Sequence, residues 1–471
     1  MKLKIAVLDN GIDNKVVFVK KNIVIDLNGL PQEHNFTNEE IYFAHGTNCA
    51  MVLKKYCHGV EICSVKILED TGKGLSKKIK PALDWCQQNN IKLINFSLGT
   101  THFQDKATIR NIINHYANRG MVIVAASAND GYKTYPASFS NAIGVVAGEA
   151  FESETDLQKH KGIDFIAPSD HEIVLEGKTF KLGNSNSYAA PYVTAMIGNF
   201  LEKEPYSNVC TIRSELSTKA GFIYCPDWIE TAWVSGQCER SRAGYYFRKV
   251  NGELKDCVSA IDTIVVGNKE EFEMYCNQAK HIVYLGKEPI ENRTFNRHFW
   301  CSQQRVEQIV GSRKRVSDID IPVIICKFSE KQDIIYWLCE LRRCFAKDGH
   351  NVFTVSSRVE SVLYDLEFLP KELCNESNRE HVLNFLYWQT YYCQSDALLL
   401  GIDNKEKDDL NVLESVADMV ILINNANGMM KADIYCDGKL EVEEVIKFLE
   451  CRAIHLFYNK ILKLFMEDAD E

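Results

Sequence analysis

The sequence has no apolar stretch long enough to cross a membrane and no apolar leader at its start. The first apolar run stops at Leu8, before Asp9, which is too short for a secretory signal or a membrane span. Basic residues do not dominate either, since 54 Lys and Arg stand against 64 Asp and Glu and give a formal net charge of -10. Without a long basic run to reverse that balance, we expect neither nucleic acid nor a membrane as a partner.

Cysteine pairs at metal-site spacing are also missing. The 17 cysteines are scattered along the chain without a Cys-x-x-Cys pair. An odd number in such a scatter favours free thiols in a reducing compartment over a disulfide framework. No acidic calcium loop is readable in the sequence. We therefore expect a cytoplasmic protein with no metal and no cofactor.

What the chain does have is an ordinary globular composition and a regular alternation of elements. Its 471 residues favour two or three domains, and 46% of them are hydrophobic. Buried strands alternate with amphipathic helices through the first 220 residues, which predicts a parallel, doubly wound α/β sheet. The strands are expected at 3–8, 60–67, 91–97, 121–125 and 142–147, and the helices at 79–89 and 106–119.

Four polar residues stand at strand ends or helix starts in this part. Asp9 follows the first strand, where α/β proteins place their sites. His45 begins a helix, Asn129 follows the strand at 121–125, and Ser187 precedes an apolar helix that runs from 188 to about 201. Three of them have an ordinary alternative on their own: an Asp turn for Asp9, a satisfied histidine for His45 and a helix N-cap for Ser187.

Taken in order, these motifs resemble those of the subtilisin-like serine proteases, the subtilases. The matching stretches are 7–12, 45–47, 95–99, 124–129 and 185–191. Asp, His and Ser follow one another in the subtilisin order, and five motifs in the right order are far more specific than any one of them. The resemblance covers roughly residues 1–220 and implies a subtilisin-like fold.

The resemblance also implies a role for each matched residue. Ser187 would attack the scissile carbonyl, His45 would carry the proton, and Asp9 would hold the imidazole. The amide of Asn129 and the Ser187 backbone N–H would receive the oxyanion. The substrate-binding residues implied in the same way, by strand pairing or as pocket walls, are Ser97, Leu98, Gly99, Ser127, Ala128 and Thr134.

The chain departs from the family pattern at three places. Ser185-Asn186 stands where Gly-Thr is usual, which should reshape the loop and affect turnover rate more than the chemistry. Ala128 replaces a wall glycine of the pocket for the residue before the cut, and Thr134 falls near that pocket's base. Both add atoms, so we expect a shallow pocket.

The remaining residues suggest a second domain. We expect a catalytic domain at 1–222, a hairpin-rich connector at 223–258, and an α/β domain at 259–471 that ends in a largely helical stretch at 442–466. The strand–loop–helix at 321–347 has the layout of a P-loop without its Gly-Lys-Ser/Thr. We therefore expect a nucleotide-binding-like domain that does not hydrolyse nucleotides and serves binding or oligomerisation.

The leading hypothesis is an intracellular serine endopeptidase of narrow specificity. No propeptide precedes Asp9, which suits an enzyme restrained by specificity, such as one that removes a leader from a precursor peptide. Its partner would be a peptide or protein substrate. The alternatives are general intracellular protein turnover and a catalytically inactive scaffold that works through residues 259–471.

Overall fold

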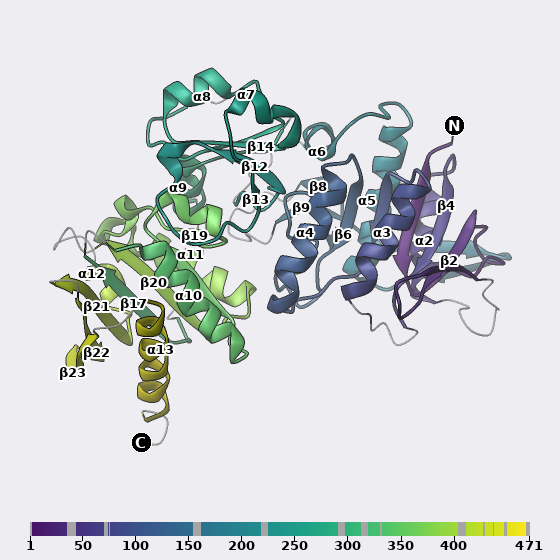
Figure 1. Cartoon of the computed structure of the whole chain (residues 1–471). Helices are drawn as coiled ribbons and strands as arrows, with labels where there is room; N and C mark the ends of the chain where they lie inside the picture. The colour runs from purple at the N-terminus through teal and green to yellow at the C-terminus, as the bar shows by residue number, and fades with distance from the viewer. Residues whose placement is uncertain are drawn as a thin grey trace. The chain divides into compact units, whose positions relative to one another are not determined.

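The computed structural model divides the chain into two compact units (Figure 1). The first holds residues 1–223, 227–230 and 292–298, and the second holds 224–226, 231–291 and 299–471. The structure describes residues 2–34, 44–69, 74, 76–153, 162–217, 225–290, 297–311, 319–329, 332–403, 411–426, 429–436, 438–446 and 450–467.

The first unit is built on a nine-stranded sheet in the order β3-β2-β4-β1-β5-β6-β7-β9-β8. Only the outermost strands, β3 and β8, pair antiparallel to their neighbours. The predicted parallel α/β sheet is confirmed. The strands are β1 (Lys4–Asp9), β2 (Lys21–Ile25), β3 (Pro31–Glu33), β4 (Glu61–Lys66), β5 (Leu93–Phe96), β6 (Val122–Ala126), β7 (Ile143–Gly148), β8 (Glu152–Ser153) and β9 (Ile163–Pro168), with a separate hairpin of β10 (Glu172–Leu175) and β11 (Lys178–Lys181).

Helices cover both faces of this sheet, because β1 is apolar on both sides. Ile5 and Val7 belong to a core shared with α2 (His45–Tyr56) and α5 (Asn186–Leu201). The alternate residues of β1 face a second core formed with α3 (Ile79–Gln88) and α4 (Lys106–Ala117). This period-two division is what a strand buried on both faces requires. A further helix, α6 (Val209–Leu216), follows α5.

The position of β1 fixes where the polar loops gather. It lies between β4 and β5 and pairs parallel with both. The strands that follow in sequence therefore lie on both sides of β1, with β4 on one side and β5 on the other. Open α/β sheets bind ligands at the carboxyl ends of the strands where the strand order reverses in this way. Asp9 is the last residue of β1 and is 1% exposed.

The second unit contains two sheets. One is a five-stranded parallel sheet in the order β13-β12-β14-β15-β16. The hairpin expectation for 223–258 is wrong, because β12 pairs parallel with both β13 and β14. Its four residues are too short a run to show that pairing in sequence. The elements are β12 (Thr231–Val234), β13 (Arg248–Lys249), α7 (Leu254–Cys257), β14 (Thr263–Val266), α8 (Lys269–Tyr275), β15 (His281–Tyr284), β16 (Phe299–Cys301) and α9 (Ser302–Val310).

The other is a seven-stranded sheet in the order β19-β18-β20-β17-β21-β22-β23. Its last three strands pair antiparallel. Its elements are β17 (Val323–Phe328), α10 (Ile334–Lys347), β18 (Val352–Ser356), β19 (Glu367–Phe368), α11 (Arg379–Tyr392), β20 (Ala397–Asp403), α12 (Asn411–Glu414), β21 (Met419–Ala426), β22 (Met429–Cys436), β23 (Lys439–Ile446) and α13 (Glu450–Glu467).

The largely helical stretch predicted at 442–466 is wrong for 442–446 and is confirmed from Glu450, where α13 begins. Residues up to Ile446 belong to β23, whose pairing with β22 outweighs the helix preference of its glutamates. The strand and helix predicted at 321–347 do form, as β17 and α10. Glu330 and Lys331 of the loop between them lie outside the described residues. None of the described helices has the length and apolar character needed to cross a membrane.

A buried hydrogen-bond chain joins α5 to the end of β5. The Thr194 hydroxyl lies 3.0 Å from Asn95 Oδ1 and 2.9 Å from the Ala190 carbonyl, and Asn95 Nδ2 donates to Ser97 Oγ at 2.8 Å. Thr194 and Asn95 are both fully buried. The chain therefore fixes Ser97, at the carboxyl edge of the sheet, relative to the helix that begins with Ser187.

We predict that Thr194→Val destabilises the protein by about 1–3 kcal/mol, because at nearly constant volume it removes a buried hydroxyl that serves two acceptors, Asn95 Oδ1 and the Ala190 carbonyl. Urea unfolding measures the change. Thr211→Val is the control, since its hydroxyl makes only an exposed contact with Asn208, and its effect should stay within about 0.5 kcal/mol. Equal effects of the two substitutions would contradict the prediction.

Candidate active site

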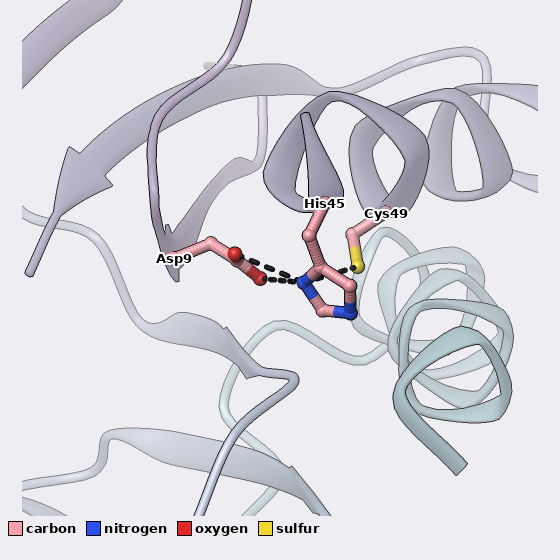
Figure 2. Close-up of side chains that lie close together, drawn as sticks. All are labelled: Asp9, His45 and Cys49. Carbon is pink, nitrogen blue, oxygen red and sulfur yellow. Dashed lines mark hydrogen bonds and ion pairs between the residues drawn. The ribbon is translucent and has the colours of Figure 1, made fainter. Parts of the chain in front are cut away.

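Asp9 and His45 form a hydrogen-bonded pair at the carboxyl end of β1. The Nδ1 atom of His45 lies 2.9 and 2.8 Å from the two carboxylate oxygens of Asp9 (Figure 2). An ionised carboxylate can only accept, so Nδ1 carries the proton of the neutral ring and Nε2 carries a lone pair. Figure 2 shows Nε2 pointing away from Asp9. The pair therefore presents a base with a fixed tautomer.

The first turn of α2 is held tightly against the loop after β1. Gly46 N donates to Asn10 Oδ1 at 3.0 Å, and Asp13 N donates to Thr47 Oγ1 at 3.0 Å. A Cβ on Gly46 would lie 2.5 Å from Gly11 O, so only glycine allows this approach. The residue after the histidine thus sets the distance at which His45 can meet Asp9.

Ser187 lies in the first turn of α5, next to the same part of α2. Pro191 has no N–H to donate to the carbonyl four residues earlier, which is that of Ser187. Cys49 Sγ donates to this carbonyl at 3.5 Å, from one turn beyond His45. The ring of Tyr188 stacks on His45 with centroids 5.5 Å apart. These contacts bring Ser187 beside the Asp9–His45 pair.

The N-cap of α5 is Ser185, so the alternative that Ser187 caps the helix is wrong. Ser185 has extended backbone angles, φ -156° and ψ 141°, and its side chain accepts from Ser187 N. The hydroxyl oxygens of Ser185 and Ser187 lie 2.8 Å apart. Among the residues that the structure describes, the Ser187 hydroxyl makes this hydrogen bond and none to His45.

Asn186 and Asn129 hold each other in place at this helix start. Asn186 N donates to Asn129 Oδ1 at 3.0 Å, which turns the Asn129 Nδ2 toward Ser185 Oγ, 3.5 Å away. The Asn186 side chain donates to the carbonyls of Ser127 and Ala128 at 3.1 and 2.9 Å. The amide of Asn129 is therefore oriented, by contacts within the chain, toward the serines of α5.

Thr134 joins the segments expected to form the specificity pocket. Its hydroxyl accepts from Ala128 N at 2.8 Å, and it is 2% exposed. A Cβ on Gly99 would lie 2.4 Å from the Thr134 methyl. The pairing of β5 with β6 ends at Phe96, so the residues from Ser97 on extend past the sheet.

The structure thus gathers the predicted residues into two neighbouring groups. Asp9 and His45 pair where α2 begins, with Ser187 of the first turn of α5 linked to the same helix through Cys49, and Asn129 faces Ser185. Sequence reasoning did not assign Cys49 a role, although its position four residues after His45 places it on the same helix face. It noted Ser185 and Asn186 as departures and did not anticipate their hydrogen bonds.

The surroundings of His45 favour its charged form. In its thiolate form, in which it no longer donates to the Ser187 carbonyl, the Cys49 sulfur 3.9 Å from Nδ1 raises the pKa of His45 most. The hydrogen bond with Asp9 raises that pKa further, while burial acts in the opposite direction. Asp9 is nearly fully buried, whereas the His45 side chain is 32% exposed. The ring can therefore take up a proton and hold it beside a shielded carboxylate.

Asp9, His45 and Cys49 also form a candidate metal-ligand group, with their ligand atoms within 4.8 Å of one another (Figure 2). Oxygen, nitrogen and sulfur donors of this kind suit Zn²⁺. A cation held by all three would need the Nδ1 lone pair, and the Asp9 hydrogen bond needs a proton on that nitrogen. Metal binding and the Asp9–His45 hydrogen bond therefore exclude each other.

Comparison with known proteins gives a consistent family match. The family model described as "Subtilase family" matches residues 1–253. Subtilisin BL of Lederbergia lenta is 29% identical over 232 residues, covering 46% of this chain and 83% of that protein. M-protease of Shouchella clausii (strain KSM-K16) is 29% identical over 232 residues, covering 46% of this chain and 59% of that protein.

A solved structure, that of Sphericase, also resembles this chain. The two chains are 22% identical in sequence, and their TM-score is 0.38. The match covers 45% of this chain and 81% of the Sphericase chain.

We predict that Cys49→Ala lowers the pKa of His45, because it removes the neighbour that raises it most. An NMR titration of the ring measures the change. Cys57→Ala, at the other end of α2, is the matched control and should leave that pKa unchanged. A His45 pKa that is the same in the wild type and in Cys49→Ala would assign the shift to Asp9 alone.

Proposed function

The chain belongs to the subtilase family and is a subtilisin-like serine protease, and on that premise we propose that Ser187, His45 and Asp9 are its catalytic triad. The observation that carries the proposal is the Asp9–His45 hydrogen-bonded pair, with Ser187 held beside it by the Cys49 contact. The pair supplies a base of the right tautomer next to a hydroxyl in the first turn of a helix.

Each group then has one task. His45 Nε2 takes the proton of Ser187 Oγ as that oxygen attacks the scissile carbonyl, and the resulting imidazolium is stabilised by Asp9. The imidazolium gives its proton to the leaving amine. Water, activated by the same ring, then hydrolyses the acyl-enzyme and restores the serine.

The oxyanion of the tetrahedral intermediate is assigned to two donors. These are the Nδ2 group of Asn129 and the backbone N–H of Ser187 at the positive end of α5. The hydrogen bond from Asn186 N to Asn129 Oδ1 supports the first assignment, since it leaves Nδ2 as the group that faces the serines. A donor oriented before the reaction needs no reorganisation during it.

Substrate recognition is proposed to use Ser97, Leu98 and Gly99 as a strand that pairs with the peptide. Ser127, Ala128 and Thr134 are proposed to wall the pocket for the residue before the cut. The close approach of Thr134 to Gly99 and its hydrogen bond to Ala128 support a pocket with little depth. A shallow pocket favours small side chains and narrow specificity.

Narrow specificity suits a processing role, and we propose cleavage of a precursor peptide as the physiological reaction. In this proposal residues 1–222 catalyse the reaction, and residues 259–471 recognise the partner or mediate oligomerisation together with β12 and β13 of the expected connector 223–258, which share a sheet with β14. The two additional sheets of the second unit support a dedicated binding part.

A cytoplasmic location is proposed with this role. Cys49, Cys57, Cys63 and Cys86 are all buried free thiols, which suits a reducing compartment.

General intracellular protein turnover would need a pocket that accepts bulky residues. An inactive scaffold would have no need of the Asp9–His45 pair. Labelling with a fluorophosphonate probe separates the enzyme from the scaffold, since stoichiometric labelling of Ser187 requires an activated nucleophile.

We predict that Ser187→Ala abolishes peptide cleavage while leaving the unfolding midpoint close to that of the wild type. Asn129→Ala should keep substrate binding and lower kcat by about a hundredfold or more, the usual effect of removing one oxyanion donor. Steady-state kinetics on a cleaved peptide measure both. Wild-type turnover by Ser187→Ala would remove this serine from the mechanism.

We predict that small residues such as Gly, Ala or Ser are preferred before the cut, and that aromatic residues are disfavoured by roughly tenfold or more, because overfilling a packed site costs about 1–3 kcal/mol. Ala128→Gly should relax the preference toward larger residues without improving turnover on small ones. A peptide library varied at this position and read by mass spectrometry compares the two proteins. A wild type that cuts best after Phe, Tyr or Leu would contradict the shallow pocket and leave the triad assignment standing.

A further inference from the structure

The Ser185 hydroxyl lies among the groups assigned to catalysis. Its oxygen is 2.8 Å from Ser187 Oγ, 3.4 Å from Ser187 N and 3.5 Å from Asn129 Nδ2. The last two atoms are the proposed oxyanion donors. An oxygen that faces both donors and also contacts the nucleophile stands where the carbonyl oxygen of a substrate has to enter.

The protons in this cluster can be assigned by counting. A hydroxyl has one proton to donate and two lone pairs to accept. Ser185 Oγ accepts from Ser187 N–H and from the Asn129 amide, which uses both lone pairs. Its own proton is then directed to Ser187 Oγ. The nucleophile accepts a hydrogen bond in this state and keeps its own proton. Among the described residues, that proton is not in a hydrogen bond to His45.

We propose that the Ser185 hydroxyl occupies the oxyanion hole of the free enzyme and holds the catalytic site in a resting state. The two long donor distances fit a neutral hydroxyl fixed by its own backbone, since a bound oxyanion would be held at about 2.7–3.1 Å. The inference rests on the proposed function, because it takes the oxyanion donors from there.

The local backbone explains why a serine can do this. Ser185 is the N-cap of α5, and its extended angles suit any residue. An N-cap hydroxyl satisfies the backbone N–H two residues later, and here that N–H belongs to the nucleophile. Helix capping and oxyanion binding therefore compete for a single donor. A residue without a side-chain acceptor at this position would leave that donor free.

Substrate binding has to displace the hydroxyl. Rotation about the Ser185 Cα–Cβ bond frees both oxyanion donors and removes the hydrogen bond that Ser187 Oγ accepts, so that the oxyanion hole and the nucleophile are both open to the substrate. The displaced hydrogen bonds are regained only when a carbonyl oxygen enters. A peptide that fits poorly cannot complete this exchange. The occupied oxyanion hole therefore protects such peptides from cleavage.

Ser185→Gly and Ser185→Ala test the proposal. Glycine at an N-cap costs only a few tenths of a kcal/mol, so this variant keeps the fold even if alanine weakens the helix. Asn208→Ala is the matched control, since it removes the side-chain cap of α6 and touches no group of the site. The rate constant for inactivation by a fluorophosphonate and the Ki of an alanyl peptide boronic acid are measured for all four proteins.

We expect both Ser185 variants to react about tenfold faster and to bind the boronic acid about tenfold more tightly than the wild type, because two ordinary hydrogen bonds no longer have to be exchanged. Asn208→Ala should match the wild type in both. In an Asn129→Ala background the gain from Ser185→Gly should shrink, since one of the two donors is gone. A structural role of Ser185 alone would not produce this dependence on Asn129.

The remaining outcomes distinguish failure of the inference about Ser185 from failure of the proposed function. If the wild type is labelled and the variants react no faster, the proposal that the Ser185 hydroxyl occupies the oxyanion hole is overturned. If the variants react more slowly, the Ser185 hydroxyl is instead a third oxyanion donor. If the probe labels the variants and does not label the wild type, the resting state is supported most strongly. No labelling of any folded protein would overturn the proposed function and this inference with it.

Discussion

The backbone N–H of Ser187 can serve one oxygen at a time, and much of the candidate site depends on which oxygen that is. In the structure the oxygen is the Ser185 hydroxyl, which caps the helix. In catalysis it would be the oxyanion of the substrate. The same first turn also has a carbonyl without a backbone donor, because Pro191 has no N–H to donate to Ser187 O. The Cys49 thiol donates to that carbonyl instead. The nucleophile is therefore positioned by how neighbouring side chains satisfy the backbone of one helical turn.

The sheet makes this arrangement possible. β1 ends in Asp9 between two parallel neighbours, and the loop after it packs against α2 through a close approach that only Gly46 allows. Helices α2 and α5 share one core beneath the site, so His45 and Ser187 cannot separate without opening that core. The buried pairing of Thr194 with Asn95 extends the same rigidity to Ser97.

Sequence alone was enough for the parallel sheet of the first unit, because its strands are apolar on both faces and alternate with amphipathic helices. It also supplied Asp9, His45 and Ser187, through motifs whose order is specific. It could not supply the contacts of Ser185 and Asn186, since these depend on a side-chain rotamer and on a loop brought from residues 127–129. Residues 442–446 of β23 were taken for helix because their glutamates favour helix and the partner strand is a tertiary contact. The parallel pairing of β12 was missed for a similar reason, since a four-residue strand gives little local signal.

The most direct test of this account is a crystal structure of the protein with an alanyl peptide boronic acid. The account predicts a bond from boron to Ser187 Oγ, with one boronate oxygen accepting from Ser187 N and Asn129 Nδ2, and with the Ser185 hydroxyl rotated out of the position it has in the free protein. An adduct in which Ser185 Oγ still accepts from Ser187 N, or in which boron bonds another residue, would contradict it.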